Sequence, residues 1–448
     1  MTDNAPITDQ RDMVAYLQGG SKPPTDWRIG TEHEKFAFDK RTLRPLGYHG
    51  ERGIAKILDE MQRFGWQAQR EEGNIIALVN ESGASISLEP GGQLELSGAP
   101  LASVHETCAE VRTHLAHMRE VCEVLGVGLL GAGHLPRWSL EDIEWIPKAR
   151  YGLMRRYMPE RGGHGLEMMK RTCTVQVNLD FADEADMVRK MRVGLALQPI
   201  ATALFANSPF KEGAPAGYAS YRSHLWQDVD PDRTGGLDLA FEPGFGFERY
   251  VDYALDVPMY FVYRDGRYID ALGQSFRDFM AARLPALPGE VPTIRDFADH
   301  LTVVFTDVRL KRFIEMRGAD SGPWRVLCAL PAFWVGLLYD EQALSAATDL
   351  TKAWTADQRQ ELRSQASLAG LAGRFAGKPL ADLARQVLAI AQQGLGRRAQ
   401  TLGESEAAFL APLHERAQEG KSPADLLLAA YHTTWDGSVD PIYRTQAY

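Results

Sequence analysis

The sequence has few cysteines and no long hydrophobic run. Four cysteines among 448 residues are too few for a disulfide scaffold, and no Cys-x-x-Cys pair suggests a zinc or thioredoxin-type site. No segment approaches the roughly 20 apolar residues that cross a bilayer, and Met1 to Pro6 show no basic run followed by an apolar one. We therefore expect a cytoplasmic protein with no membrane partner.

The chain also has no surplus of positive charge. Its formal net charge of -10 repels phosphate backbones, and no Lys/Arg cluster is interleaved with aromatic residues as in single-strand binders. We expect no nucleic-acid partner. An acidic protein that handles an anionic nucleotide needs metal ions or placed arginines.

Several familiar catalytic motifs are missing. No HExxH, GxSxG or protein-kinase signature occurs. Gly126 to Gly131 match GxGxxG, but they follow a helical pattern and are strand-like, which is the reverse of a dinucleotide site. A P-loop ending at Gly377-Lys378 would need glycine at Ala372 and serine or threonine at Pro379. No P-loop or Rossmann site is therefore expected.

The chain does have enough apolar residues, 45%, for a large core. Apolar residues between Ser103 and Leu125 recur in alternating steps of four and three, which predicts a long helix. The middle third mixes short strands with turns and lacks regular strand–helix alternation, and the pattern turns helical from Thr355 onward. We expect an α+β fold in one domain, residues 1–448, with a helical region of about 350–448 packed onto it.

Four segments place polar side chains on one face of an extended strand, because strand side chains alternate. The face-sharing residues are Glu32 with Glu34, Glu89 and Glu95 on either side of a Pro-Gly-Gly turn, Gln176 with Asn178, and Glu315 with Arg317. Magnesium takes oxygen ligands and works with nucleotide phosphates, so carboxylates gathered on one sheet face would suit it. The competing explanation is that each strand simply exposes a polar face to solvent. That explanation would have to apply separately to all four segments.

Single residues are less informative. His33 lies between two glutamates, but its side chain should point to the opposite sheet face, so we expect a structural histidine. Arg150 and Arg222 stand in polar-aromatic contexts that suit recognition of a carboxylate or phosphate, although spacing alone assigns neither. Cys108 and Cys122 share a helix face roughly 21 Å apart, so any bridge from Cys108 goes to Cys173 or Cys328.

Seven stretches together closely resemble the plant-type glutamate-cysteine ligases of plants and proteobacteria. They occur in family order over nearly the whole chain, which makes them more specific than any short motif. The matching stretches are Gly30–Phe36, Glu89–Ser97, Thr174–Asp180, Arg222–Trp226, Asp256–Tyr260, Glu315–Asp320 and Cys328–Trp334.

The resemblance implies a glutamine-synthetase-like fold, a curved and mostly antiparallel sheet backed by helices, whose concave face holds nucleotide, metals and amino acids. It also implies the first step of glutathione biosynthesis. The γ-carboxylate of glutamate attacks ATP, and the cysteine amine then displaces phosphate from γ-glutamyl phosphate to give γ-glutamylcysteine. The implied partners are glutamate, cysteine and ATP as co-substrate, with about two or three magnesium ions as cofactor.

The same resemblance implies residue roles. Arg150 and Arg222 are candidates for binding substrate carboxylates, Arg317 for phosphate charge, and Asn178 for orienting a substrate or a metal-bound water. The expected magnesium ligands are Glu32, Glu34, Glu89, Glu95 and Glu315.

The plant members also carry a regulatory disulfide whose cysteines match Cys108 and Cys328, and its reduction lowers their activity. A second plant cysteine pair falls on Ala271 and Ala286 here. We therefore expect redox regulation through Cys108–Cys328 but a monomer, with a weak homodimer as the alternative. Two other functions stay open: a ligase of the same superfamily with another amine acceptor, and a carboxylate-metal hydrolase. A non-catalytic binding protein would leave the polar strand faces unexplained.

Overall fold

One antiparallel sheet forms the centre of the protein. The computed structural model describes residues 4–448, so residues 1–3 of the expected domain lie outside it. Within that range nine strands pair in the order β14-β15-β7-β1-β5-β4-β3-β2, and β6 pairs with the far end of β1, every pair being antiparallel. The strands are β1 (Ile29–Asp39), β2 (Gln67–Glu71), β3 (Asn74–Val79), β4 (Ser85–Leu88), β5 (Leu94–Ser97), β6 (Val127–Leu130), β7 (Thr174–Leu179), β14 (Val308–Leu310) and β15 (Ile314–Asp320).

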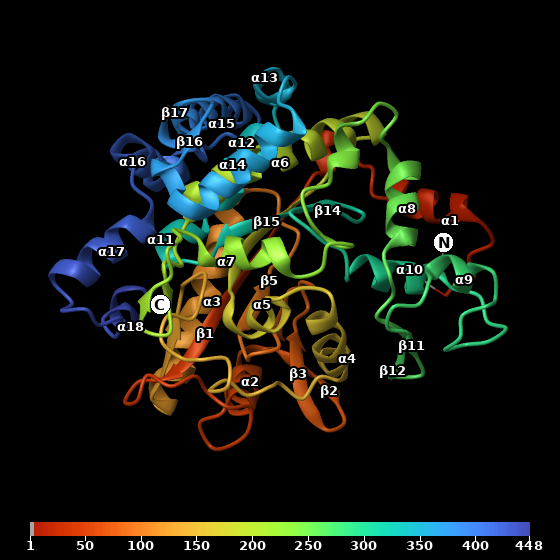
Figure 1. The fold of residues 1–448 in the computed structure, drawn as a ribbon, viewed down its shortest axis with the longest axis horizontal. Coiled ribbons are helices and arrows are strands. Elements are labelled where there is room, and N and C mark those ends of the chain that lie inside the picture. Colours follow the sequence, from red (N-terminus) through yellow and green to blue (C-terminus); the bar gives the residue numbers. More distant parts are fainter. Residues whose placement is uncertain (1–3) are drawn as a thin grey trace.

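Helices surround this sheet (Figure 1), and in the described part of the chain four two-stranded ribbons lie outside it. None of the helices within residues 4–448 is long and apolar enough to cross a membrane. The ribbons are β8 (Phe210–Lys211) with β9 (Ala214–Pro215), β10 (Thr234–Gly235) with β13 (Phe305–Thr306), β11 (Phe261–Arg264) with β12 (Arg267–Asp270), and β16 (Arg374–Phe375) with β17 (Lys378–Pro379). The helices are α1 (Gln10–Gln18), α2 (Ile54–Met61), α3 (Val104–Leu125), α4 (Ala149–Tyr157), α5 (Gly165–Arg171), α6 (Glu184–Phe205), α7 (Tyr221–Leu225), α8 (Phe247–Asp256), α9 (Phe276–Met280), α10 (Ile294–Leu301), α11 (Trp324–Leu327), α12 (Ala329–Leu338), α13 (Glu341–Thr351), α14 (Ala356–Ala369), α15 (Leu380–Leu402), α16 (Ala411–Glu419), α17 (Pro423–Thr433) and α18 (Ile442–Thr445).

One face of the sheet is apolar and carries the main core. Helix α3, the long helix that the periodicity predicts, begins at a capping box in which Ser103 and Glu106 satisfy each other's backbone N–H groups. It packs behind β1 and β6, while α6 packs on β15 and α12 on β7. His33 points to this face, is fully buried, and lies with its ring 5.5 Å from that of His114 on α3. The expectation of a structural histidine agrees with this placement.

The opposite face carries the polar side chains. Helices α4, α5 and α7 cover it, since residues from each line a cavity together with the strand glutamates. The region after Thr355 is largely helical, as expected, and its longest helix, α15, packs on α12. The β16–β17 ribbon interrupts it, because Ala376 and Gly377 form a tight turn with positive φ.

A disulfide joins two of the helices behind the sheet. Cys108 on α3 is bonded to Cys328 at the start of α12, with their Cα atoms 5.6 Å apart. Cys122 and Cys173 are free and buried. Of the two partners that spacing left open for Cys108, the structure therefore selects the one that the resemblance implied.

Candidate active site

A cavity of about 360 Å³ lies between the polar sheet face and the helices that cover it. Its walls combine acidic and basic side chains with a few aromatic and methionine residues. Most of the residues expected at the site meet here, but Asn178 and Glu315 do not line the cavity. Those that do are Glu32, Glu34, Glu89, Glu95, Arg150, Arg222 and Arg317.

Four of these residues, Glu32, Glu34, Glu89 and Glu95, form what we call the carboxylate wall. Glu34 on β1 stands directly opposite Glu95 on β5, so their side chains share one sheet face. Their hydrogen-bond partners are neutral: Glu34 accepts from the backbone N–H of Thr174 at 2.9 Å and Glu95 from the Ser87 hydroxyl at 3.1 Å. No ion pair within residues 4–448 includes a member of this wall.

This crowding changes the protonation of the wall. Burial, with repulsion from Glu89, raises the pKa of Glu34 to about 8, and burial with repulsion from Glu32 raises the pKa of Glu95 well above its usual range. Bound cations would offset this repulsion. Within residues 4–448 no three acidic, histidine or cysteine side chains form a ready-made metal cage. Magnesium commonly completes its shell with water and phosphate oxygens, so this donor set fits a metal held jointly with a nucleotide.

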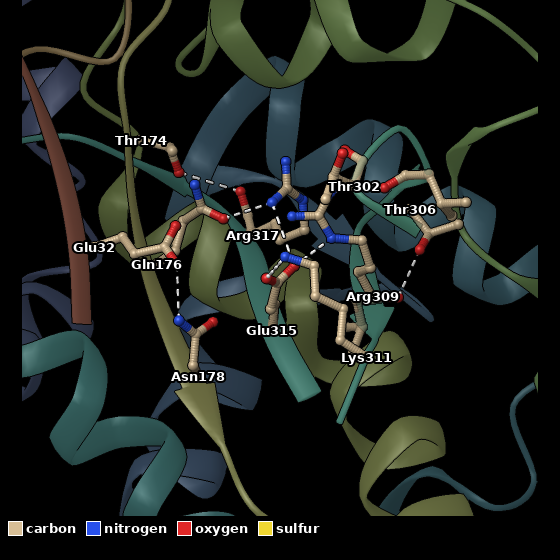
Figure 2. A network of polar contacts seen from close by, with 12 residues as sticks. Glu32, Thr174, Gln176, Asn178, Thr302, Thr306, Arg309, Lys311, Glu315 and Arg317 are labelled. Atoms are coloured by element: carbon tan, nitrogen blue, oxygen red, sulfur yellow. Dashed lines mark hydrogen bonds and ion pairs between the residues drawn. The ribbon is translucent and has the colours of Figure 1, made fainter. Parts of the chain in front are cut away.

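The other side of the site, which we call the basic wall, consists of Arg309, Lys311 and Arg317 around Glu315 (Figure 2). Glu315 faces Arg309 across the β14–β15 ladder and is ion-paired with it. Lys311 Nζ lies 2.7 Å and Arg317 Nη1 3.6 Å from its carboxylate oxygens. Burial opposes ionisation of Glu315, but the three cations outweigh it and hold its pKa well below the usual range.

Two amides on β7 each bond to one of the walls. Asn178 Nδ2 donates to Glu32 Oε1 at 2.7 Å, and Arg317 Nη1 donates to Gln176 Oε1 at 2.8 Å (Figure 2). Gly30 lies opposite Asn178 on β1, and a Cβ at this glycine would press on the Asn178 side chain at 3.3 Å. The glycine thus leaves room for the amide that orients Glu32.

Arg150 and Arg222 reach the cavity from helices α4 and α7. The Arg150 guanidinium lies 5.4 Å from the ring centre of Phe261, and Arg222 Nη2 donates to the backbone carbonyl of Arg317 at 3.0 Å. In both arginines the buried Nε–H has no hydrogen-bond partner within residues 4–448. Each therefore keeps a donor available for an anion.

Three further residues that line the cavity lie outside the sequence-based set. Arg309 lines the cavity from β14, and Lys148 and Tyr151 line it from the start of α4. Lys148 Nζ donates to the carbonyl of Leu88 at 3.2 Å, and burial lowers its pKa. Tyr151 donates to the same carbonyl at 2.6 Å and lies 3.4 Å from Glu89 Oε1. For Lys148 and Tyr151, the sequence signal that could have identified them is their position next to Arg150.

The chain is similar to known proteins over nearly its whole length. The sequence model of glutamate-cysteine ligase family 2 matches residues 28–445. This chain belongs to that family. It is 55% identical over 443 residues to glutamate–cysteine ligase B of Oryza sativa subsp. japonica, covering 99% of this chain and 88% of that protein. It is 54% identical over 444 residues to the Arabidopsis thaliana glutamate–cysteine ligase, covering 99% and 83%.

A solved structure supports the fold. The glutamate–cysteine ligase of Francisella tularensis, crystallised with AMP, superposes with a TM-score of 0.55 at 12% identity, covering 95% of this chain and 89% of that one. The expected α+β fold, an antiparallel sheet backed by helices, is confirmed. The reaction is ATP-dependent ligation of the glutamate γ-carboxylate to the cysteine amine, and the alternative functions are not favoured.

The comparisons contradict one expectation. The plant relatives are named chloroplastic, whereas the first residues of this chain led us to expect a cytoplasmic protein. That expectation was wrong, because the folding and chemistry of a ligase domain are the same in either compartment and its composition does not reveal the compartment.

Proposed function

We propose that the ligase holds its magnesium at the carboxylate wall. The observation that carries this proposal is the pairing of Glu34 with Glu95 in a buried site without any basic partner. The ligands would be Glu32, Glu34, Glu89 and Glu95, together with Glu315 from the far side. Glu315 already has three basic neighbours, so as a ligand it would share its carboxylate between metal and arginine.

Bound magnesium supplies positive charge that lets the γ-carboxylate of glutamate approach the terminal phosphate of ATP. Arg317 and Arg309 stabilise the negative charge that develops on the transferring group from the opposite wall. A carboxylate oxygen bonds to phosphorus as the bond to ADP breaks, giving γ-glutamyl phosphate. The cysteine amine then bonds to the acyl carbon, loses a proton, and inorganic phosphate leaves with the C–O electron pair.

The remaining groups bind and orient. Arg150 and Arg222 offer their free Nε–H donors to substrate carboxylates. Asn178 fixes the Glu32 carboxylate by donating to it, as an outer-shell partner of a metal ligand does.

We also propose one catalytic domain, a monomeric state and redox control. The main hydrophobic core includes Ile7 near one end and Ala417 near the other, which supports a single domain. The exposed large apolar residues Val124, Val291, Leu368, Leu402 and Leu426 are scattered over separate elements, which supports a monomer. Light scattering under oxidising and reducing conditions tests the monomer, and a protein that elutes as a dimer in both contradicts it.

The direct test of the chemistry measures ADP release with ATP and glutamate, with and without magnesium. Cysteine, 2-aminobutyrate, alanine, ammonia and no acceptor are compared, with mass detection of products. We expect magnesium-dependent ADP release that forms γ-glutamylcysteine. Full turnover after complete metal removal would overturn the metal proposal.

A further inference from the structure

Asp320 carries a buried carboxylate without a directly contacting basic side chain: burial raises its pKa, and the positive charge of Arg222 and the hydrogen bonds described below oppose that shift. It is the last residue of β15, is 1% exposed, and takes part in no ion pair within residues 4–448. Its charge is instead satisfied by three hydrogen bonds. Oδ2 accepts from the Asn207 backbone N–H at 2.9 Å and the Ser208 hydroxyl at 2.6 Å, and Oδ1 accepts from the Ser220 hydroxyl at 2.8 Å. Burying a carboxylate costs free energy unless the carboxylate is hydrogen-bonded in this way. We therefore asked what these hydrogen bonds hold in place.

The two serine hydroxyls lead directly to α7, the helix that carries Arg222. The Ser220 oxygen caps this helix by accepting from the Ser223 backbone N–H at 3.1 Å. The Ser208 oxygen accepts from the Arg222 backbone N–H at 3.2 Å. A hydroxyl has one proton, and since each serine donates it to Asp320, only lone pairs face the helix. Asp320 thereby fixes both hydroxyls as acceptors.

The same strand also holds the other end of Arg222. A register shift between Met316 and Ala319 interrupts the β15–β7 ladder, and the Arg317 carbonyl in this interval accepts from Arg222 Nη2 at 3.0 Å. β15 therefore fixes the backbone of Arg222 through Asp320 and its guanidinium through Arg317. The Arg222 Nε–H, buried at the cavity, is left without a partner in the described residues.

The position of Asp320 is itself restricted. A Cβ at Gly133 would clash with the Asp320 carboxyl group, so the chain after β6 closes tightly over it. The Gly133 backbone N–H also bonds to the carbonyl of Asn207 at 3.2 Å. Little room is left for the carboxylate to adopt another rotamer.

We propose that Asp320 is a positioning residue that sets Arg222 for binding a substrate carboxylate. The inference rests on the proposed role of Arg222. Asp320→Asn keeps the size of the side chain but replaces one acceptor oxygen with an N–H₂ donor. At least one serine must then turn its proton toward α7, where it opposes a backbone N–H and displaces Arg222.

The experiment measures kcat and the KM values for glutamate, cysteine and ATP. Loss of a hydrogen bond to a charged group corresponds to about a tenfold change in affinity, so Asp320→Asn should raise the KM for an amino-acid substrate about tenfold. The KM for ATP should change little. Arg222→Lys should raise the same KM, and the double variant should be no worse than Arg222→Lys alone.

Asp180→Asn is the matched control. Asp180 is a second buried carboxylate next to the sheet, 4% exposed, but it accepts from Lys22 and from the backbone N–H of Arg28, far from α7. It should lower the thermal midpoint without a selective KM change. A profile for Asp320→Asn that matches this control, or a change in the KM for ATP alone, overturns the inference.

The role of Arg222 and the role of Asp320 can be refuted separately. If Arg222→Lys leaves every KM unchanged, the proposed role of Arg222 is wrong. If Arg222→Lys raises an amino-acid KM and Asp320→Asn does not, only the positioning inference is wrong. Should Asp320→Asn fail to fold, Ser208→Ala decides, because it keeps the carboxylate and removes one link: a raised amino-acid KM supports the inference, and an unchanged one overturns it.

Discussion

The carboxylate wall and the basic wall both contain buried carboxylates, but they compensate the negative charge in opposite ways. Both bury charge on one sheet face, but Glu315 is surrounded by Arg309, Lys311 and Arg317, whereas Glu34 and Glu95 have neutral partners only. The pKa of Glu315 is accordingly held low, and those of Glu34 and Glu95 are raised. The protein supplies the counter-charge on one side and leaves it to a ligand on the other. Stability should therefore depend mainly on the basic wall with Glu315, and turnover should depend on the carboxylate wall.

The largest expected effect is on turnover. Glu95→Gln should lower kcat by at least about 10²–10³-fold, because charge stabilisation at the transferring phosphate is lost. The metal-free protein should be no less stable than the wild type, since a carboxylate with a raised pKa has been neutralised. Steady-state kinetics with cysteine measure the change in kcat, and a thermal melt in the presence of chelator measures the stability.

A control for this variant is Glu110→Gln on α3, where a partly buried carboxylate accepts from the Ala99 backbone N–H at 2.9 Å behind the sheet. It should retain near-normal kcat. Full activity in Glu95→Gln would end the functional assignment of the carboxylate wall.

The next largest effect is on the stability of the metal-free protein. Here a substitution in the basic wall should destabilise the fold, whereas Glu95→Gln should not. Glu315→Gln should destabilise the fold by about 3–5 kcal/mol, because it leaves Arg309, Lys311 and Arg317 facing one another in a buried site. Urea unfolding of the metal-free protein measures this. If Glu315→Gln and Glu95→Gln prove equally stable, the two walls do not differ as we describe.

A disulfide variant sharpens the comparison by acting on neither wall. The bridge between Cys108 and Cys328 joins helices behind the sheet, so Cys108→Ser should lower the unfolding free energy by about 2–4 kcal/mol. The loss should be equal in wild-type and Glu95→Gln backgrounds. Unequal losses would mean that the bridge and the carboxylate wall are coupled. Non-reducing peptide mapping verifies that the bridge is present in the starting protein.

The effect that is smallest per unit change is the pH dependence of stability in the metal-free protein. Glu34 has a folded pKa of about 8, above its ordinary value of 4.5. Between these values the folded protein holds a proton that the unfolded chain has lost, so stability should fall as pH rises, by up to about 1.4 kcal/mol per pH unit for one such group. Glu315, with a lowered pKa, has the opposite dependence and loses its contribution only as pH falls below its ordinary range.

Chemical denaturation between about pH 5.5 and pH 8 compares wild type with Glu34→Gln. The variant should show a shallower decline. A wild-type stability that rises over this interval would contradict the raised pKa of Glu34.

The sequence was informative wherever side-chain alternation decides the outcome. The period of two correctly placed Glu32 with Glu34, and opposite His33, because alternation is a local property of a strand. The spacing of apolar residues likewise predicted α3. These patterns, with the long matching stretches, were sufficient for the fold class and for most of the acidic side of the cavity.

The basic side depended on contacts that no local pattern contains. β14 is three residues long, too short to show alternation, so Arg309 and its pairing with Glu315 were not foreseen. Lys148 and Tyr151 reach the cavity through the packing of the start of α4 against the end of β4. The bonds of Asp320 to Asn207, Ser208 and Ser220 join segments far apart in the sequence, and only the folded chain brings them together.

The central claim is that the carboxylate wall binds the metal, and its most direct test is crystallographic. Crystals grown with manganese in place of magnesium and a non-hydrolysable ATP analogue would give anomalous difference maps that locate each ion. We predict peaks between the nucleotide phosphates and the carboxylate oxygens of Glu34, Glu89 and Glu95. Ions bound to the phosphates but out of contact with all of these carboxylates would contradict the account.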